Sequence, residues 1–430
     1  MASCRHGATR NFLVQRHHQT MHRICHIITG LNVGGAERHL AALLSRLEAG
    51  PDDADGGDRQ SSAAGGFHNE VISLLEPGAM AAELGRIPVF SLGMDRGLSA
   101  PHKWPGAMRR LARLLESRPP DLVQTWMYHA DLAGAAAIRL AHWPGKKPPL
   151  VWGLRNAYVS KGAVRLSTRG VITMLALLSR RRSSGPAAII APSQTAVRIH
   201  AKLGYAANTL AVIPSGVDTD RFRPDAGARA RLLDAAGIAD PDVLLVGFVS
   251  RWDPVKDVPG FLAALAALPE DMTPRVRAVL MGTGLNRENR ELAAMVDTHP
   301  LKQSIRLLGV RGDLPALLPG LDVAVNSSRG ESLPMAVLEA MSCGVACVVT
   351  DVGDSAIAVG KTGFVAPPGD AGALASAMAA VLRLPDEERR GLGSAARERA
   401  LLEYGLDRSA ARYAALYRTL IAGRGLTEFI

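Results

Sequence analysis

One stretch decides the fold of this chain: residues 321–349 read LDVAVNSSRGESLPMAVLEAMSCGVACVV. The apolar runs at its two ends are typical of buried strands. Between them, Pro334 suits the first turn of a helix and Gly344 suits its end. The stretch therefore predicts a strand, a loop that carries Glu331, a short helix that carries Glu339, and a second strand.

The two glutamates have two interpretations. At a strand-to-helix turn, free backbone N–H groups and the helix dipole attract an anion, and nearby carboxylates can accept hydrogen bonds from sugar hydroxyls. Alternatively, Glu331 is an acid near a helix N-terminus and Glu339 lies on the solvent face. The spacing alone leaves both interpretations open.

Strands and helices alternate along most of the chain, which indicates parallel sheets with right-handed crossovers. The expected fold class is α/β, with two Rossmann-like doubly wound sheets that bind ligands at the carboxyl ends of their strands. After about residue 369 the chain is mostly helical. The expected strands are 23–29, 69–74, 87–91, 121–127, 149–153, 187–191, 210–213, 243–250, 275–281, 304–308, 321–326, 345–349 and 363–365.

Turn-forming residues from Ile213 to Pro224 interrupt this alternation and predict a linker. Residues 50–66 are rich in Gly, Asp, Ser and Ala and predict a surface loop. The N-terminus has no apolar signal segment, so we expect a disordered extension or a true start at Met21. The expected units are an extension at 1–21, an N-terminal domain at 22–213, the linker at 214–224, a C-terminal domain at 225–400, and helices at 401–430 that pack back toward the N-terminal domain.

Composition narrows the function classes. The chain has 430 residues, a formal charge of +10, 47% hydrophobic residues and only 4% aromatic residues. Nucleic-acid binding is disfavoured because no zinc finger or aromatic-basic motif is present and few aromatics could stack bases. Four cysteines, Cys4, Cys25, Cys343 and Cys347, are too few for a disulfide framework and form no zinc pattern, so we expect buried thiols in a reducing compartment. No run is long enough to span a membrane.

Six basic residues and no acid lie in the segment 161–182, namely Lys161, Arg165, Arg169, Arg180, Arg181 and Arg182. An apolar stretch lies among them. A basic amphipathic helix of this kind can rest on an anionic bilayer. A core helix with solvated basic ends fits equally well.

Two further candidate sites follow first strands. Gly34 and Gly35 open a helix after the first strand, where the backbone can approach an anion closely, although a tight packing turn is the common alternative. Their spacing is not a dinucleotide fingerprint. Arg251 and Lys256 follow the strand at 243–250 and could clamp a diphosphate, or they could be surface charges.

Two weaker candidates also follow strands. His129 comes after the strand at 121–127, where it could meet a ligand or be a satisfied structural histidine. Gly282 and Gly284 form a turn after the strand at 275–281 and could pass close to a nucleotide, but one glycine pair is weak evidence.

Taken together, these motifs resemble a known pattern. A Gly-Gly pair near the N-terminus, Arg-x4-Lys after a mid-chain strand and Gly-Glu-x7-Glu-Ala-Met-x-Cys-Gly at 330–344 are similar to the family-4 retaining glycosyltransferases of GT-B fold. The resemblance extends over nearly all of residues 22–425, and it includes Thr350-Asp351-Val352-Gly353-Asp354 and the linker. Five ordered matches are far more specific than any one of them.

The resemblance implies a role for each candidate. Arg251 and Lys256 would bind the donor diphosphate and stabilise the leaving nucleotide, an electrostatic task. Glu331 would contact the donor sugar, with the N–H groups of Ser332 and Leu333 nearby. The remaining implied contacts are Glu339 on the ribose, Gly35 on the diphosphate from the N-terminal domain, and His129 beside the sugar or acceptor. Together with these, Gly34, Gly282 and Gly284 remain candidate donor-binding residues from the strand-end pattern.

The family also implies a setting. Its members typically need no metal or other cofactor and retain the anomeric configuration. The donor would be a nucleotide-diphosphate sugar, with a UDP-sugar favoured, and the acceptor a glycan or lipid-linked glycan for surface polysaccharide or glycolipid. We expect a cytoplasmic protein without nucleic-acid partners, with residues 161–182 as the candidate contact to the inner face of the plasma membrane.

Departures from the family pattern keep other functions open. Ser332-Leu333-Pro334 stands where the family often has Gly-Phe-Pro, which puts the donor sugar in doubt, and Ser215 replaces the usual Asn. A catalytically silent sugar-nucleotide-binding or scaffold protein is the main alternative, which the retained cations and glutamates disfavour. The missing fingerprint disfavours a Rossmann oxidoreductase, and Glu-x7-Glu disfavours a sugar-nucleotide epimerase.

Overall fold

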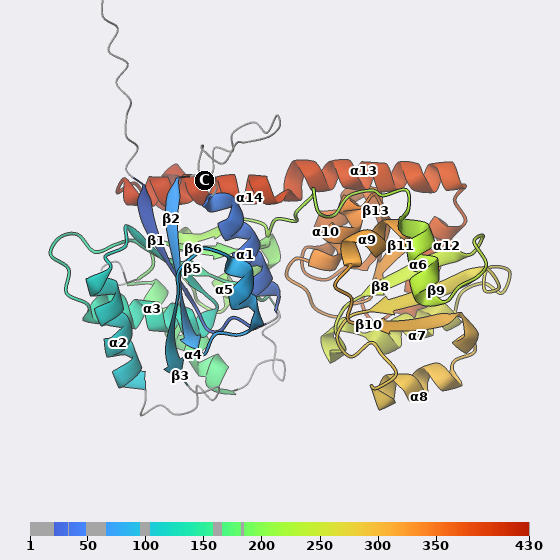
Figure 1. Ribbon diagram of the computed structural model, residues 1–430, viewed down its shortest axis with the longest axis horizontal. Helices are drawn as coiled ribbons and strands as arrows, with labels where there is room; N and C mark the ends of the chain where they lie inside the picture. The colour runs from blue at the N-terminus through green and yellow to red at the C-terminus, as the bar shows by residue number, and fades with distance from the viewer. Residues whose placement is uncertain are drawn as a thin grey trace, which may run out of the picture.

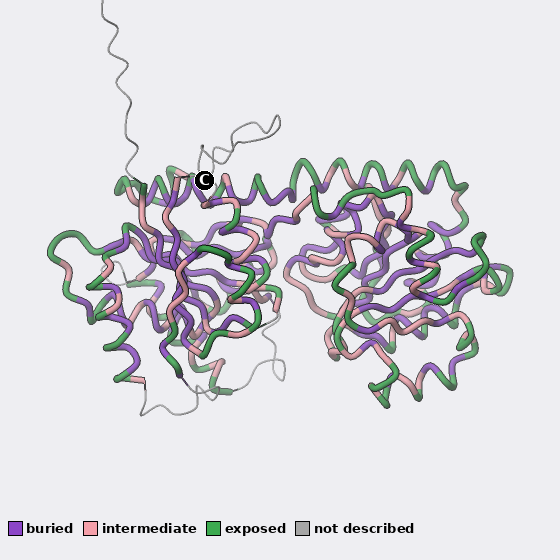
Figure 2. The backbone as a smooth tube through the Cα atoms, viewed as in Figure 1, coloured by how far each residue is buried: buried purple, intermediate pink, exposed green. Residues whose placement is uncertain are grey.

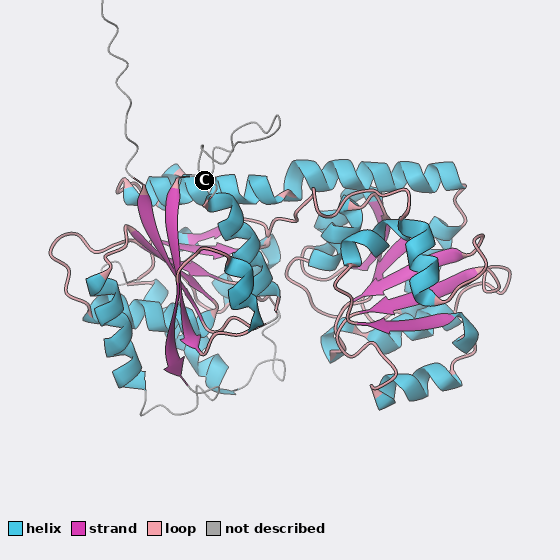
Figure 3. Ribbon diagram, viewed as in Figure 1, coloured by secondary structure: helices cyan, strands magenta, loops and turns pink. Residues whose placement is uncertain are grey.

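The computed structural model consists of two α/β halves placed side by side (Figure 1). It describes residues 21–32, 34–48, 66–94, 104–157, 166–181 and 185–429. Each half is built on one parallel sheet with helices on both faces (Figure 3). The expected fold class, two doubly wound parallel sheets, is confirmed.

The first sheet has seven strands in the order β3-β2-β1-β4-β5-β6-β7. They are β1 (His22–Ile28), β2 (Phe67–Leu75), β3 (Val89–Met94), β4 (Leu122–Trp126), β5 (Leu150–Gly153), β6 (Ala188–Ala191) and β7 (Leu210–Val212). The strand order reverses between β1 and β4, and a parallel sheet leaves a crevice at the carboxyl ends of its strands at such a point. The loops that carry Gly35 and His129 therefore begin at this crevice.

Helices bury both faces of the first sheet, which explains why its strands are nearly continuous apolar runs. One face packs against α1 (Gly35–Leu47), the short 3-10 helix η1 (Ala79–Leu84) and α14 (Leu406–Ile421). The other face packs against α2 (Trp104–Ser117), α3 (Tyr128–Leu140), α4 (Leu166–Ser179) and α5 (Gln194–Lys202). Tyr413 and Tyr417 of α14 are fully buried, so the last long helix belongs to the core of the first half.

The second sheet has six strands in the order β10-β9-β8-β11-β12-β13. They are β8 (Leu244–Val249), β9 (Val276–Met281), β10 (Ile305–Gly309), β11 (Val323–Asn326), β12 (Ala346–Thr350) and β13 (Gly363–Ala366). The helices are α7 (Val258–Ala266), α8 (Arg290–Thr298) and α12 (Ala371–Leu382) on one face, with α6 (Ala228–Ala236), α9 (Leu314–Leu317), α10 (Met335–Ser342), α11 (Ser355–Val359) and α13 (Asp386–Tyr404) on the other. The order reverses between β8 and β11, so the loops with Lys256 and Glu331 meet.

The chain passes between the halves twice, and the two connecting segments are hydrogen-bonded to each other. Val217 in the first crossing donates its N–H to the carbonyl of Tyr404 at 2.8 Å, and Leu406 in the second donates to the carbonyl of Val217 at 2.9 Å. α13 lies along the second half and α14 along the first (Figure 1). The buried backbone concentrates in the two sheets, so each half has its own core (Figure 2).

Every strand expected from the sequence is present, with end points shifted by a few residues at most. One helix start differs: α10 begins at Met335, and Pro334 is its N-cap with extended backbone (φ −80°, ψ 91°). The proline carbonyl still accepts the first helical hydrogen bonds, at 3.0 and 3.2 Å. The expected extension at 1–21, except Met21, and the expected loop at 50–66, except Gly66, lie outside the described residues. Within the described residues, no helix is both long and apolar enough to cross a membrane.

Candidate functional site

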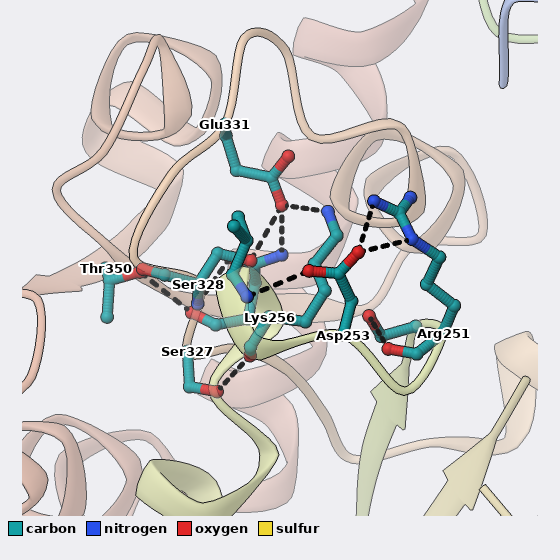
Figure 4. Close-up of polar contacts among 10 residues, drawn as sticks. Arg251, Asp253, Lys256, Ser327, Ser328, Glu331 and Thr350 are labelled. Atoms are coloured by element: carbon teal, nitrogen blue, oxygen red, sulfur yellow. Dashed lines mark hydrogen bonds and ion pairs between the residues drawn. The ribbon is translucent and has the colours of Figure 1, made fainter. Parts of the chain in front are cut away.

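The two loops at the switch point of the second sheet meet through an ion pair. The Nζ of Lys256 lies 2.5 Å from the Oε1 of Glu331, and the two side chains are 18% and 9% exposed. Oε1 also accepts hydrogen bonds from Asn326 Nδ2 at 3.2 Å and Ser328 Oγ at 2.7 Å. Figure 4 shows all three donors converging on this one oxygen. The other carboxylate oxygen points away from them, so it can accept hydrogen bonds from a ligand.

The loop after β11 holds Glu331 in place by bonding its neighbours on both sides. Ser327 Oγ donates to the carbonyls of Lys256 and Asp257 at 3.0 and 2.9 Å. On the other side, Thr350 Oγ1 at the end of β12 donates to the carbonyl of Ser328 at 2.6 Å. The carboxylate is therefore positioned by three strand ends of one rigid sheet.

Arg251 lies in the same loop as Lys256 but is far more accessible. Its side chain is 62% exposed, and its guanidinium donates to Asp253 Oδ2 at 2.8 and 3.0 Å. Asp253 Oδ1 in turn accepts the N–H of Val255 at 2.9 Å and caps the 3-10 helix η4 (Pro254–Lys256). The loop thus offers one half-buried cation and one exposed cation at the same sheet edge (Figure 4).

Glu339 lies one turn into α10, and it is half-buried rather than on an open solvent face. Burial raises the pKa of its carboxyl to about 7, although Arg38 and Arg221 act in the opposite direction. Arg38 belongs to α1 of the first half and Arg221 to the linker. Glu339 therefore faces cations from outside its own half, and neither arginine was indicated by the sequence motifs.

Gly282 and Gly284 serve close backbone packing. Both have positive φ, at 136° and 74°. A Cβ on Gly282 would overlap the carbonyl oxygen of Ser250, and one on Gly284 would lie 2.7 Å from the Cβ of Trp252. The turn after β9 thus packs against the loop that carries Arg251.

The first half presents Gly34 and Gly35 at the start of α1 and His129 at the start of α3. A Cβ on Gly35 would meet nothing within 4 Å, so the space in front of it is open. Burial lowers the pKa of the half-buried His129, which therefore stays neutral near pH 7. Two residues before His129, Met127 is a non-glycine residue with φ of 76°, and backbone strain of this kind often occurs at functional sites.

Ser332 and Leu333 lie at the junction of the halves. Ser332 Oγ is 2.8 Å from Ser193 Oγ at the start of α5, and Leu333 is buried in the core of the second half. Ser193 was not indicated by any sequence motif, because its partner is 139 residues away. No group of three or more potential metal-ligand side chains occurs within the described residues.

Comparisons with known proteins fit this architecture. The family described as "Glycosyltransferase Family 4" matches residues 59–221, and "Glycosyl transferases group 1" matches residues 243–383. The first match lies mainly in the first half of the molecule, and the second lies within the second half. Both halves together define a glycosyltransferase. The chain belongs to the family-4 glycosyltransferases of GT-B fold.

The sequence identity to individual relatives is low. The chain is 27% identical over 244 residues to UDP-Gal:alpha-D-GlcNAc-diphosphoundecaprenol alpha-1,3-galactosyltransferase of Escherichia coli, over 56% of this chain and 60% of that enzyme. It is 27% identical over 325 residues to 2-deoxystreptamine glucosyltransferase of Streptomyces kanamyceticus, over 73% and 81% of the two chains. Among solved structures, Anabaena Alr3699/HepE in complex with UDP and glucose matches with a TM-score of 0.75 at 22% identity, over 93% and 100% of the chains.

Proposed function

We propose that this glycosyltransferase moves a sugar from a nucleotide-diphosphate sugar, with a UDP-sugar favoured, onto a glycan or lipid-linked acceptor, with retention of anomeric configuration. The observation that carries the proposal is the Lys256–Glu331 pair with Arg251 beside it at the sheet switch point. Ligands bind at such a point in open α/β sheets.

The donor diphosphate would lie against Lys256 and Arg251. Positive charge fixed at this place stabilises the negative charge that develops on the leaving nucleotide, and it can do so without a metal ion. In the structure Glu331 Oε1 lies 2.5 Å from Lys256 Nζ and neutralises it. When the donor binds, the ammonium group would turn toward the phosphate, and Glu331 would accept hydrogen bonds from hydroxyls of the sugar.

The nucleoside would be held by Glu339, whose carboxylate would accept hydrogen bonds from the ribose hydroxyls. Gly282 and Gly284 would shape the wall that the nucleotide approaches. From the first half, Gly34 and Gly35 would bring the N-terminus of α1 to the diphosphate, because the space in front of Gly35 is open. His129 would lie beside the sugar or acceptor as a neutral group.

Names of similar proteins support the donor class. The solved Anabaena relatives are described in complex with UDP, with UDP and glucose, and with UDP-glucose. The E. coli relative is named for UDP-Gal and for an acceptor on diphosphoundecaprenol. We therefore propose a lipid-linked glycan as the acceptor and surface polysaccharide or glycolipid assembly as the process, in the cytoplasm.

A membrane-facing surface on α4 accompanies this proposal. Leu166, Met174 and Leu177 are 83%, 46% and 62% exposed, and their spacing places them on one side of the helix. Arg169 lies within α4, and Arg181 lies two residues beyond its end. An apolar stripe between arginines suits the headgroup region of an anionic bilayer. Lys161, Arg165 and Arg182 lie outside the described residues.

The proposal is tested by incubating the protein with UDP-, GDP- and ADP-sugars and measuring nucleotide binding and donor hydrolysis. We expect one UDP-sugar to be bound and slowly hydrolysed, and Glu331→Ala to lower hydrolysis by about 10²-fold or more. If no sugar nucleotide binds or is hydrolysed, and Glu331→Ala changes nothing, the transferase proposal fails.

A further inference from the structure

Asp354 occupies an unusual place at the junction of the halves. It is the N-cap residue of α11 in the second half, and aspartate at this position normally bonds the free N–H groups of its own helix. Here the side chain makes no such bond. Its carboxylate instead reaches the first turn of α5 in the other half.

The contact is specific and buried. Asp354 Oδ2 accepts the N–H of Gln194 at 2.7 Å, and Oδ1 accepts the N–H of Thr195 at 2.9 Å. The residue is only 5% exposed. Ser193 Oγ accepts the next N–H, from Ala196, at 3.1 Å. In the first turn of α5, the N-cap serine therefore accepts one backbone N–H, and an aspartate 160 residues from Gln194 accepts two.

Asp354 is also hydrogen-bonded to the loop that carries Glu331. The N–H of Asp354 donates to the carbonyl of Ser332 at 3.0 Å. Gly353 lies directly under this loop, because a Cβ there would overlap the carbonyl of Glu331, and its φ of 60° suits glycine. Thr195 Oγ1 of α5 donates to the carbonyl of Gly353 at 3.0 Å. Gly353 and Asp354 therefore both accept hydrogen bonds from α5.

We propose that Asp354 is a positioning residue, which fixes the Glu331 loop against α5 when the two halves meet and so couples their closure to the geometry of the donor site. The inference rests on the proposed function, because it takes Glu331 as the residue that contacts the donor sugar. Asp354 itself touches no reacting atom. Loss of its carboxylate would leave the N–H groups of Gln194 and Thr195 without this acceptor, while the Thr195–Gly353 and Ser193–Ser332 hydrogen bonds would remain between α5 and the Glu331 loop segment.

Asp354→Asn tests this role, since the amide keeps the shape but can accept only one of the two N–H groups. Asp351→Asn is the matched control, because Asp351 lies three residues earlier in the same loop and is exposed. For the best UDP-sugar found, we expect Asp354→Asn to lower kcat for donor hydrolysis by roughly 10- to 100-fold while the Kd for UDP changes less than about twofold. Asp351→Asn should match the unaltered protein in both.

A cross-link measures the junction without any activity. Ser193 Oγ and Ser332 Oγ are 2.8 Å apart, so cysteines at both positions should form a disulfide when oxidised. Cys4 is replaced by serine in this background. The remaining thiols should react slowly, because burial raises the pKa of Cys25 well above its usual value and those of Cys343 and Cys347 to about 12. Adding Asp354→Asn should slow the cross-link several-fold.

The outcomes separate three failures. If the cysteine pair does not cross-link, or cross-links equally fast with Asp354→Asn, the junction role of Asp354 is wrong whatever the activity shows. If Asp354→Asn leaves kcat equal to that of Asp351→Asn, the coupling to the donor site is wrong. If no sugar nucleotide is bound or turned over while the cross-link behaves as expected, the proposed function fails and the junction stands.

Discussion

At the residue scale, the central feature is that Glu331 directs one oxygen to three donors and leaves the other available. Among the donors to that oxygen in the described part of the chain, Lys256 is charged, and Asn326 and Ser328 are neutral. Charge and stability are therefore linked here, because a carboxylate that is 9% exposed costs free energy once its cation is removed.

Lys256→Met removes the positive charge but retains the apolar stem of the side chain, so it distinguishes the effect of charge on catalysis from its effect on stability. We expect donor hydrolysis to fall by about 10²- to 10³-fold and the free energy of unfolding to fall by roughly 1–3 kcal/mol. Adding Glu331→Gln should restore stability but not hydrolysis. Urea unfolding and hydrolysis assays measure both, with Lys361→Met, an exposed lysine on the same half, as the control. A double variant no more stable than Lys256→Met would contradict the expectation.

Glu339 predicts a pH dependence of nucleotide binding. Its pKa is raised by burial to about 7, so the carboxyl is half protonated near neutral pH. Only the ionised form accepts charge-assisted hydrogen bonds from ribose hydroxyls. UDP affinity, measured by calorimetry, should therefore rise as the pH increases through about 7. Glu339→Gln should bind more weakly and lose that dependence. A wild-type affinity that falls as the pH rises would show that this assignment is wrong.

At the element scale, two glycines at strand-to-helix turns do different work. Packing requires glycine at position 282, because φ is 136° and a Cβ would overlap the carbonyl of Ser250. Gly35 is the first residue of α1, and a Cβ there would meet no atom within 4 Å. The turn after β9 is thus required by the fold, and the start of α1 is left free for a ligand.

Paired alanine substitutions distinguish these roles. Gly282→Ala should destabilise the protein by about 1–3 kcal/mol or more, because it adds strain and displaces the Arg251 loop. Gly35→Ala should change stability by less than about 0.5 kcal/mol, yet weaken donor binding at least tenfold by blocking close approach of the diphosphate. Thermal unfolding and donor titration test both. A Gly35→Ala protein with unchanged donor affinity would remove Gly35 from the proposed site.

At the scale of the whole molecule, the +10 charge and the exposed face of α4 bear on location. We expect the protein to float with anionic liposomes and to lose this when Arg180, Arg181 and Arg182 are changed to glutamine, because each basic residue near an anionic surface contributes about 1 kcal/mol. Changing Arg408, Arg412 and Arg424, which lie on or after α14, removes the same charge elsewhere and should leave flotation intact. Equal flotation by both triple variants would contradict a specific α4 surface.

Much of the fold follows from local sequence. Every strand of both sheets was predicted, because strands buried on both faces are apolar runs bounded by turn formers. The ordered motifs also indicated the family, and Lys256 and Glu331 do meet as neighbouring loops should. Pro334 was placed one position too far into α10, since the pattern does not distinguish an N-cap from a first turn.

By itself, the sequence determined the two doubly wound halves and the loops that carry the candidate residues, because strand runs and turn residues act over short range. Only the tertiary structure decided which distant groups share a site. It directs the carboxylate of Asp354 to α5 rather than α11, and it places Arg38 and Arg221 near Glu339. It also leaves Glu339 half-buried, where the helix pattern could equally have left it in open solvent. These features depend on how the halves pack together, and packing across 160 residues leaves no local pattern.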